Sequence, residues 1–383
     1  MPRCSTYVAL VLAVALSPLP FAPRAGLVPA ATRLLFGEFA FAFCGYKLVV
    51  KPLLRHPQKL PPFEFTPLSD LGAAAAKDNR WLDTYLTSAD GTRLHAVVDD
   101  TTARVPGKRA IVFLHGFPEG WLAWKPQLEH SVGLGHSVLA LSMRGYGLSD
   151  QPSEVAKYHT DHLVEDVEAA INAVTVEGLP SPLLVAHDWG AGVAWEYLHL
   201  PNIEAKVAGY VALATPPSEG VIREIEGLKA QLLASMYVPF FNAPVLSELL
   251  LGTGHAWFVA ALVSHCVSAN HTCADERHLA FYRTSFSRPG ALTAALNYYR
   301  AAVQLAKPPE RRWHPSNQLQ LPVLMLRGTH DLYLLKDGFL GHEAYLAHGE
   351  HLELDGCSHW LQNDCASSVN HELDRFLDKL ETR

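Results

Sequence analysis

The sequence predicts an α/β fold in which a mostly parallel sheet carries helices on both faces and a helical cap is inserted before the last strands. Buried-type strand runs alternate with helical patterns along the first part of the body. The strand runs stop over residues 218–308 and return near residue 322. The chain has 383 residues, 49% hydrophobic and 18% charged, which fits one large globular domain with an insertion or a short anchor.

The first part of the body is expected to span residues 78–217. The turn dipeptide Asp90-Gly91 between two alternating runs predicts an opening hairpin, and short apolar runs predict buried strands. The expected strands are Trp81–Leu86, Leu94–Val98, Ala110–Leu114, Ser137–Leu141, Pro182–Ala186 and Val207–Ala214, with helices at residues 160–175 and Gly190–Leu200.

Residues 218–308 contain helix-like segments without a buried strand run, and a helical block between two strands of one sheet is typical of a cap. The strand rhythm returns at Pro322–Leu326 and His351–Leu354, and Ser367–Leu380 fits a closing helix. Residues 309–383 are therefore expected to complete the body.

The first 54 residues differ in composition from the body. Tyr7–Phe21 is short for a membrane span and is broken by prolines, and Leu34–Val50 is a second apolar stretch. We expect residues 1–54 to be a hydrophobic signal-anchor that associates the chain with a membrane, that of the endoplasmic reticulum. The alternative is a cleaved signal or transit peptide, which would give a secreted, lumenal or organellar protein. The proline-rich residues 55–77 are expected to be a linker.

Charge and cysteine content narrow the possible partners. The formal net charge is −7 and no basic run stands out, so a nucleic-acid partner is not expected. The sequence has no C-x-x-C pair, no HExxH motif and no nucleotide-binding glycine pattern, so we expect no metal and no cofactor. We expect the cysteines of the body to be free buried thiols. Disulfides Cys266–Cys273 or Cys357–Cys365 are the alternative if the body faces an oxidising lumen.

The segment VAHDWGAG, residues 185–192, has the pattern of a nucleophile elbow. A strand ends there, a sharp turn follows and a helix begins, with the small residues Ala186 and Gly190 two positions on either side of Asp188. Small residues are needed because the turn brings the strand and helix backbones together. The alternative is that Asp188 is an ordinary helix N-cap.

A carboxylate nucleophile restricts the chemistry. Attack of Asp188 on an acyl carbon would give a reactive anhydride, whereas attack on a saturated carbon displaces a leaving group and gives an ester that water can hydrolyse. The substrate is therefore expected to contain a polarised carbon–oxygen or carbon–halogen bond. A serine esterase is excluded because position 188 is not a serine.

The loop in LHGFPEGWLAW, residues 114–124, follows a strand and can aim a backbone N–H at the nucleophile. We expect the N–H groups of Phe117 and Trp189 to form an oxyanion hole. Each such donor typically contributes ~3–4 kcal/mol in the transition state. The alternative is an ordinary strand-to-helix turn.

His359 lies after the last expected strand and just before the closing helix, where a general base is expected. Asp331 follows the strand PVLML, at a strand end where sites of α/β sheets form, and is expected to orient His359. Each residue alone is weak evidence, but the order nucleophile, acid, histidine is the one expected of an α/β hydrolase.

Four motifs together resemble the epoxide hydrolases of the α/β-hydrolase fold, both the microsome-associated single-anchor type and the soluble plant type. The motifs are HGFPE (115–119), SMRGYGLSD (142–150), AHDWGAGVAW (186–195) and GCSHWLQ (356–362). The resemblance covers about residues 78–380 and implies an α/β-hydrolase fold. It assigns the nucleophile to Asp188, the charge-relay acid to Asp331 and the general base to His359.

The same resemblance implies two cap tyrosines that donate to the epoxide oxygen. ALNYYR, residues 295–300, matches the second tyrosine motif and assigns that role to Tyr299, with the neighbouring Tyr298 as a further substrate contact. MYVPFFNAP, residues 236–244, matches the segment of the first tyrosine but has Phe240 at that position. Either Tyr299 acts alone or Tyr237 contributes from one turn away. A phenol suits this task because it donates a hydrogen bond while remaining neutral.

We therefore expect an epoxide hydrolase that converts an epoxide and water to a vicinal diol through an ester on Asp188. Apolar cap residues such as Phe240, Phe241, Leu249 and Trp257 suggest a hydrophobic, lipid-derived epoxide as the substrate, and Trp189 is expected to contact it. A haloalkane or haloacid dehalogenase of the same fold is one alternative, and a ligand receptor without catalysis is the other.

Overall fold

A computed structural model describes residues 71–99, 107–226, 230–235, 237–263, 275–305 and 316–382. The expected anchor of residues 1–54, most of the expected linker, and Cys4, Cys44, Cys266 and Cys273 lie outside the described residues. Residues 71–77 of the expected linker pack on the body, where Ala73–Ala76 form the short 3-10 helix η3 and the Trp121 indole donates to the Leu71 carbonyl.

Eight strands form one sheet in the order β1-β2-β4-β3-β5-β6-β7-β8. β1 and β2 form an antiparallel hairpin and β2 pairs antiparallel with β4, whereas every pair from β4 onward is parallel. The strands are β1 (Trp81–Thr87), β2 (Arg93–Asp99), β3 (Ala110–Leu114), β4 (Ser137–Leu141), β5 (Leu183–His187), β6 (Gly209–Leu213), β7 (Leu319–Gly328) and β8 (Leu346–Leu354). The predicted mostly parallel sheet is confirmed.

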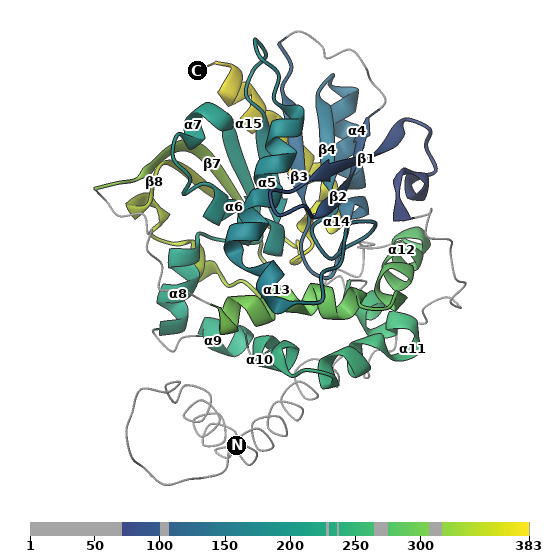
Figure 1. Cartoon of the computed structure of the whole chain (residues 1–383). Helices are drawn as coiled ribbons and strands as arrows, with labels where there is room; N and C mark the ends of the chain where they lie inside the picture. The colour runs from purple at the N-terminus through teal and green to yellow at the C-terminus, as the bar shows by residue number, and fades with distance from the viewer. Residues whose placement is uncertain are drawn as a thin grey trace.

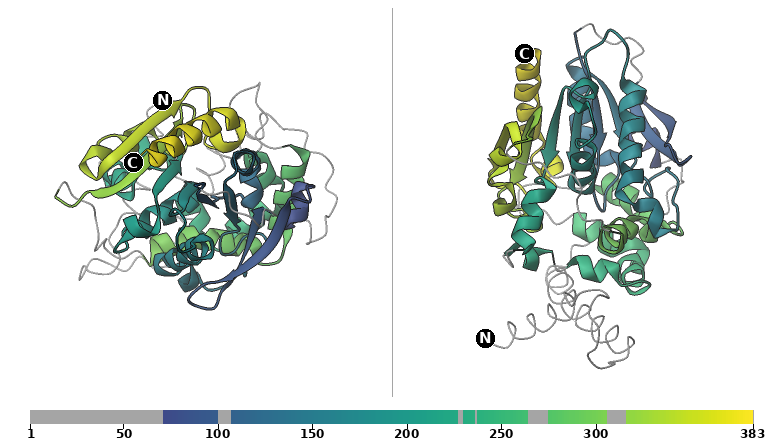
Figure 2. Two further views of the ribbon diagram at one scale, coloured as in Figure 1. Left: turned by 90° about the horizontal axis from the view of Figure 1, so that it is seen from above. Right: turned by 60° about the vertical axis from the view of Figure 1, so that its left-hand side comes forward.

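Helices cover both faces of this sheet, as predicted (Figures 1 and 2). The alternation within β3 shows why, because Val112 packs into one core and Ile111 and Phe113 pack into the core on the opposite face. α5 and α6 contribute to the first core, and α4 and α15 to the second. The helices of the body are α4 (Lys125–Gly133), α5 (Thr160–Val174), α6 (Asp188–Tyr197), α7 (Ile203–Lys206), α14 (Leu361–Asp364) and α15 (Ala366–Glu381), with 3-10 turns η4 (Trp121–Trp124), η5 (Val155–Tyr158), η6 (Lys336–Phe339) and η7 (His342–Ala344).

A helical cap lies between β6 and β7 in the sequence and beside one end of the sheet in space (Figure 1). Its helices are α8 (Ser218–Glu226), α9 (Ala230–Ala234), α10 (Tyr237–Asn242), α11 (Leu246–Val263), α12 (Glu276–Ser287) and α13 (Ala291–Gln304). Within the described ranges, no individual helix has both the length and the apolar composition of a membrane span. One pair of consecutive segments, Ala230–Asn242 and Leu246–Gly252, has that length and composition when the two are counted together, and the pair is bent by 99°.

The structure corrects the prediction for two cysteines. Cys357 and Cys365 form a disulfide with a Cα–Cα distance of 5.9 Å, so the expectation of free thiols is wrong for this pair. The two residues meet because the chain turns between the end of β8 and the start of α15, which brings them within ordinary disulfide range.

Candidate active site

Asp188 occupies the sharp turn between β5 and α6. Its φ of +46° is a left-handed conformation that is uncommon for residues other than glycine. The turn also requires small neighbours, because a Cβ on Gly190 would come within 2.6 Å of the carbonyl oxygens of Leu114 and His115. A Cβ on Gly116 would come within 2.4 Å of the Asp188 Cβ. The backbone therefore forms the elbow expected from the sequence.

The Asp188 carboxylate faces the loop and the histidine expected around it. Its Oδ1 accepts a hydrogen bond of 2.7 Å from the Phe117 N–H, and its Oδ2 lies 3.5 Å from His359 Nε2. Burial raises the pKa of this carboxyl, but the nearby imidazoles of His359 and His187 and the Phe117 N–H outweigh it and hold the pKa below its ordinary value. Asp188 is thus an ionised carboxylate rather than a cap for its own helix.

His359 lies between two carboxylates. Its Nδ1 is 2.8 Å from Asp331 Oδ2, and its Nε2 points to Asp188. Burial lowers the pKa of the imidazole, but the charges of Asp331 and Asp188 and the hydrogen bonds with them raise it to about 10. The two carboxylates therefore favour the protonated form of the ring in the free protein.

Asp331 is itself held in place by backbone amides. Its Oδ1 accepts hydrogen bonds from the N–H groups of Tyr333 at 2.8 Å and Leu334 at 3.0 Å, which leaves Oδ2 for His359. The side chain is fully buried. This arrangement fixes the position and the orientation of the imidazole.

The expected oxyanion-hole donors lie on either side of the nucleophile. Phe117 follows β3, and its N–H already points at Asp188 Oδ1. Trp189 is the second residue of α6, so its N–H belongs to the first helical turn, whose amides have no acceptor within the helix. The Phe117 N–H therefore already meets the Asp188 side chain, and the Trp189 N–H remains the expected second donor.

Tyr299 of α13 reaches this site from the cap. Its ring packs edge-on against Trp189, with 4.9 Å between ring centroids, and against Phe117, with 5.3 Å. Burial and the charge of Asp188 raise the pKa of its phenol well above the ordinary value. Tyr237 of α10 lies behind it, 6.1 Å from the Tyr299 ring, and burial raises its pKa also. Both tyrosines are neutral hydrogen-bond donors.

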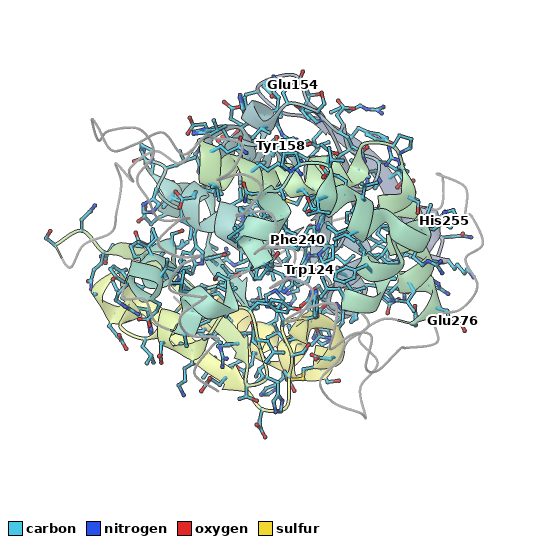
Figure 3. All side chains as sticks on the ribbon, turned by 90° about the horizontal axis from the view of Figure 1, so that it is seen from below. Trp124, Glu154, Tyr158, Phe240, His255 and Glu276 are labelled. Carbon is cyan, nitrogen blue, oxygen red and sulfur yellow. A yellow bond between two sulfur atoms is a disulfide. The ribbon has the colours of Figure 1, made fainter. Side chains whose placement is uncertain are left out.

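The remaining expected cap residues lie elsewhere. The Tyr298 hydroxyl donates to the Arg144 carbonyl at 2.8 Å, so this tyrosine attaches the cap to the body, although its ring contacts Trp189. Phe240 is buried against Phe241 near the middle of the cap (Figure 3). Leu249 is 65% exposed and does not line the site. The side chain of Trp257 lies outside the described residues.

One aromatic residue of the site, Tyr333, was not identified from the sequence, whereas Phe241 was expected among the apolar cap residues. Phe241 packs against Phe117 and against Tyr299, and Tyr333 packs against His359 and Tyr237. The position of Tyr333, two residues after Asp331, was the only signal in the sequence for this residue.

A buried polar cluster behind His359 was also not identified. His187 Nε2 lies 3.0 Å from the His359 carbonyl oxygen, and His187 Nδ1 lies 2.8 Å from a Glu119 carboxylate oxygen. Gln362 donates to the other oxygen of Glu119 at 2.8 Å. All three side chains belong to motifs quoted from the sequence, but nothing in the sequence brings them together.

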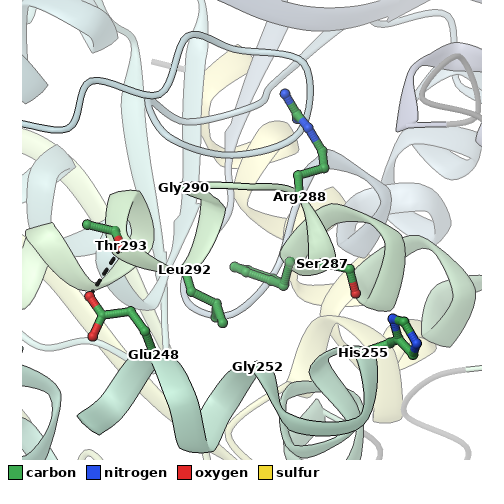
Figure 4. A pocket seen from close by; sticks show the side chains of 9 residues that line it. Glu248, Gly252, His255, Ser287, Arg288, Gly290, Leu292 and Thr293 are labelled. Carbon is green, nitrogen blue, oxygen red and sulfur yellow. Dashed lines mark hydrogen bonds between the residues drawn. The ribbon is translucent and has the colours of Figure 1, made fainter. Parts of the chain in front are cut away.

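A separate cavity of about 280 Å³ lies in the cap between α11 and the start of α13 (Figure 4). Glu248, Phe286, Arg288 and Thr293 are among its lining residues, and Glu248 is paired with Arg300 at 2.8 Å. None of the expected catalytic residues lines it. This cavity is therefore not the site around Asp188.

Comparisons with known proteins identify the family of this chain. Residues 109–364 match the family described as alpha/beta hydrolase fold. Epoxide hydrolase 3 of Mus musculus is 31% identical over 298 residues, 76% of this chain and 76% of the relative. Epoxide hydrolase 4 of Mus musculus is 29% identical over 378 residues, 95% of this chain and 99% of the relative.

Solved structures of epoxide hydrolases have the same fold as this chain. An epoxide hydrolase from Bacillus megaterium superposes with a TM-score of 0.64 at 25% identity, covering 77% of this chain and all of that chain. Because the family match covers residues 109–364 and an epoxide hydrolase is 31% identical over 76% of this chain, the chain belongs to the epoxide hydrolase family of the α/β-hydrolase fold.

Proposed function

We propose that this protein is an epoxide hydrolase that opens a hydrophobic epoxide to a vicinal diol through an ester on Asp188. One observation carries the proposal. An ionised carboxylate at a strained elbow lies 3.5 Å from an imidazole that is paired with a second carboxylate, beneath a neutral phenol of the cap. The names of the related proteins support the same activity.

In the first half of the reaction an Asp188 oxygen attacks an epoxide carbon, and the bond from that carbon to the ring oxygen breaks. Tyr299 donates its phenolic proton to the oxygen as negative charge develops. Its raised pKa suits this role, because a phenol that resists ionisation remains a donor in the resting site. The product of this half is a hydroxyalkyl ester of Asp188.

The second half requires His359 as a base, and ester formation prepares it. The charge of Asp188 is one cause of the raised pKa of His359, and the ester has no such charge. The imidazolium can then return a proton to the Tyr299 phenolate through solvent, and the neutral imidazole takes one from the attacking water while Asp331 keeps the ring oriented. Hydroxide attacks the ester carbonyl, the N–H groups of Phe117 and Trp189 stabilise the oxyanion, and the diol leaves.

The expected substrate is apolar around the epoxide. Tyr299, Phe117, Phe241 and Trp189 form an aromatic cluster beside Asp188, with ring centroids 4.9–5.3 Å apart along its contacts. Such a cluster favours a hydrophobic epoxide, and a lipid-derived one fits this description. Water is the second substrate.

The proposal is tested with trans-stilbene oxide as a hydrophobic epoxide. Asp188→Ala should lose all turnover while circular dichroism shows an intact fold. His359→Gln should form the ester and keep it, so that intact-protein mass spectrometry detects an increase equal to one substrate. A single turnover in ¹⁸O-labelled water should first place an unlabelled Asp188 oxygen in the diol.

Two results would contradict the proposal. Turnover by Asp188→Ala would remove the nucleophile from the scheme. Release of chloride from a haloalkane without turnover of any epoxide would instead establish the dehalogenase alternative.

We also propose that the catalytic body faces an oxidising lumen, with residues 1–54 holding it at the membrane. The Cys357–Cys365 disulfide supports this orientation, because disulfides persist in such compartments. Asn270-His271-Thr272 is a glycosylation sequon. In a eukaryotic host the full chain should gain a glycan sensitive to endoglycosidase, and an unmodified Asn270 would argue for the opposite orientation.

A further inference from the structure

We infer that the Cys357–Cys365 disulfide positions His359 for hydrolysis of the ester, an inference that rests on the proposed function. The residues from Cys357 to Cys365 are named the base segment here, because His359 is the third of them. The disulfide joins the two ends of this segment. Cys357, Ser358, His359 and Trp360 are all at most 4% exposed, so the segment lies within the body.

The first end of the base segment is tied to the loop that carries Asp331. The Cys357 carbonyl accepts a 2.9 Å hydrogen bond from the N–H of His330, the residue directly before Asp331. The end of β7 lies against it, since a Cβ on Gly328 would come within 2.3 Å of the carbonyl oxygens of Cys357 and Ser358. Cys357 therefore sets the position of the base relative to its acid.

The second end is tied to a long helix. The Cys365 carbonyl accepts a 3.0 Å hydrogen bond from the Val369 N–H in the first turn of α15. α15 packs into the core through Val369, Leu373 and Leu377, each at most 4% exposed. The disulfide thus transmits the fixed position of α15 directly to Cys357.

The base segment has further restraints, both local ones and contacts with the body: His187 Nε2 lies 3.0 Å from the His359 carbonyl oxygen, and Gln362 donates to Glu119 at 2.8 Å. α14 is a helix of only four residues, without a side-chain cap at its N-terminus. Asp364 accepts from the Ser358 N–H at 2.8 Å, and the Ser358 hydroxyl accepts from the Trp360 N–H at 3.1 Å. These bonds shape the segment but do not join Cys357 to α15, which the disulfide does.

The nucleophile does not depend on this segment in the same way. The backbone of Asp188 is held by β5 and α6, and its Oδ1 by the N–H of Phe117, all outside the base segment. The base segment reaches this region through the His359 side chain and through the contact of the His359 carbonyl with His187. Loss of the disulfide should therefore impair the half-reaction that needs His359 more than the half-reaction that needs Asp188. This difference separates a positioning role from a general effect on stability.

The test compares the two half-reactions in the double variant Cys357→Ser, Cys365→Ser, again with trans-stilbene oxide. Rapid-quench mass spectrometry gives the rates of ester formation and ester loss. We expect ester formation within about twofold of the native rate, and ester loss slowed about ten- to hundredfold, as displacements near 1 Å can cause. The ester should accumulate in the steady state.

A reversible form of the test uses the folded native chain. Dithiothreitol supplies two electrons and two protons, converts the disulfide to two thiols and becomes its own cyclic disulfide. Ester loss should slow on reduction and recover on reoxidation, and reduction should not change the double variant. This measurement remains possible even if the double variant does not fold.

Leu377→Ala is the matched control for stability, since it weakens the packing of α15 several turns away from Cys365. It should lower the melting temperature without changing the ratio of the two rates. Equal slowing of both half-reactions, or unchanged ester loss without the disulfide, would overturn the positioning role and leave the proposed function intact. Absence of any ester in His359→Gln would instead refute the proposed function.

Discussion

Asp188 and His359 each hold the other in its charged form. The pKa of Asp188 is lowered, so its contribution to folding stability is present above its ordinary value of 3.8 and is lost as the pH falls below it. The pKa of His359 is raised from 6.5 to about 10, so its contribution is full below pH 6.5 and is lost as the pH rises toward 10. The pair therefore stabilises the fold most between about pH 4 and 6.5.

Two adjacent tyrosines allow the role of the cap phenol to be tested. Tyr299→Phe removes the donor beside Asp188, and ester formation should slow about 10²–10³-fold, as expected for loss of a general acid. Tyr298→Phe removes only the bond to the Arg144 carbonyl, and should lower the melting temperature while changing ester formation by a few-fold at most. Single-turnover rates of both variants provide the comparison.

A larger loss of rate in Tyr298→Phe than in Tyr299→Phe would show that the assignment is reversed. Comparable activity of the native chain and Tyr299→Phe would point to Tyr237, whose ring lies 6.1 Å from that of Tyr299.

At the scale of elements, the turn from β5 to α6 and the loop after β3 form one unit. Gly116 lies against Asp188, and Gly190 lies against the carbonyl oxygens of Leu114 and His115. The close approach of these backbones lets the Phe117 N–H reach the carboxylate. The elbow therefore depends on the absence of side chains as much as on the presence of Asp188.

Two glycines of α6 test this dependence. Gly190→Ala places a Cβ 2.6 Å from two backbone oxygens, so the elbow must open and turnover should fall at least about 10²-fold. Gly192→Ala meets no atom within 4 Å and should keep full activity, with a gain of about 0.5–1 kcal/mol in the free energy of unfolding. Turnover assays and urea denaturation measure the two effects, and full activity of Gly190→Ala would refute the steric requirement.

At the scale of the whole molecule, a buried charge cluster joins the opening hairpin, the loop after β4 and α5. The guanidinium of Arg144 is fully buried, 2.8 Å from Asp90 and 2.7 Å from Asp166. The Arg144 carbonyl in turn accepts from the cap residue Tyr298. One residue thus connects the sheet edge, the body helices and the cap.

Removal of the Arg144 side chain should lower the free energy of unfolding by an amount that depends on pH. Arg144→Met leaves Asp166 buried without its cationic partner, and the free energy of unfolding at pH 7 should fall by about 3–5 kcal/mol. The native pKa of Asp90 is lowered by its bonds with Arg144 despite burial, so this part of the stability is present above pH 3.8 and declines below it. The cost of the substitution should therefore shrink at pH 3.5, as measured by urea unfolding at both pH values.

Lys157→Met is the matched control, because this lysine contacts the same Asp90 at 3.2 Å but is 41% exposed. This substitution should lower the free energy of unfolding by less than about 1 kcal/mol, because exposed ion pairs contribute no more than that. Equal costs for the two variants would contradict a special role for the buried arginine.

The sequence by itself determined the architecture and the position of the elbow that holds Asp188. The predicted strands Ala110–Leu114 and Ser137–Leu141 are the observed β3 and β4, because short apolar runs between turn residues carry a local signal. α6 begins at Asp188, two residues earlier than predicted, and β8 begins five residues before the predicted His351, since its first residues alternate weakly in polarity. The elbow was predictable because its steric rule acts on residues two positions apart.

Only the tertiary structure decided which distant side chains meet. The disulfide, the buried cluster of Glu119, His187 and Gln362, and the contacts of Phe241 and Tyr333 join segments whose packing no local pattern describes. His187 and Gln362 are 175 positions apart in the chain. The hydrophobic periodicity of a segment indicates which of its own side chains are buried. Which residues of other segments they contact depends on how whole helices and strands pack together.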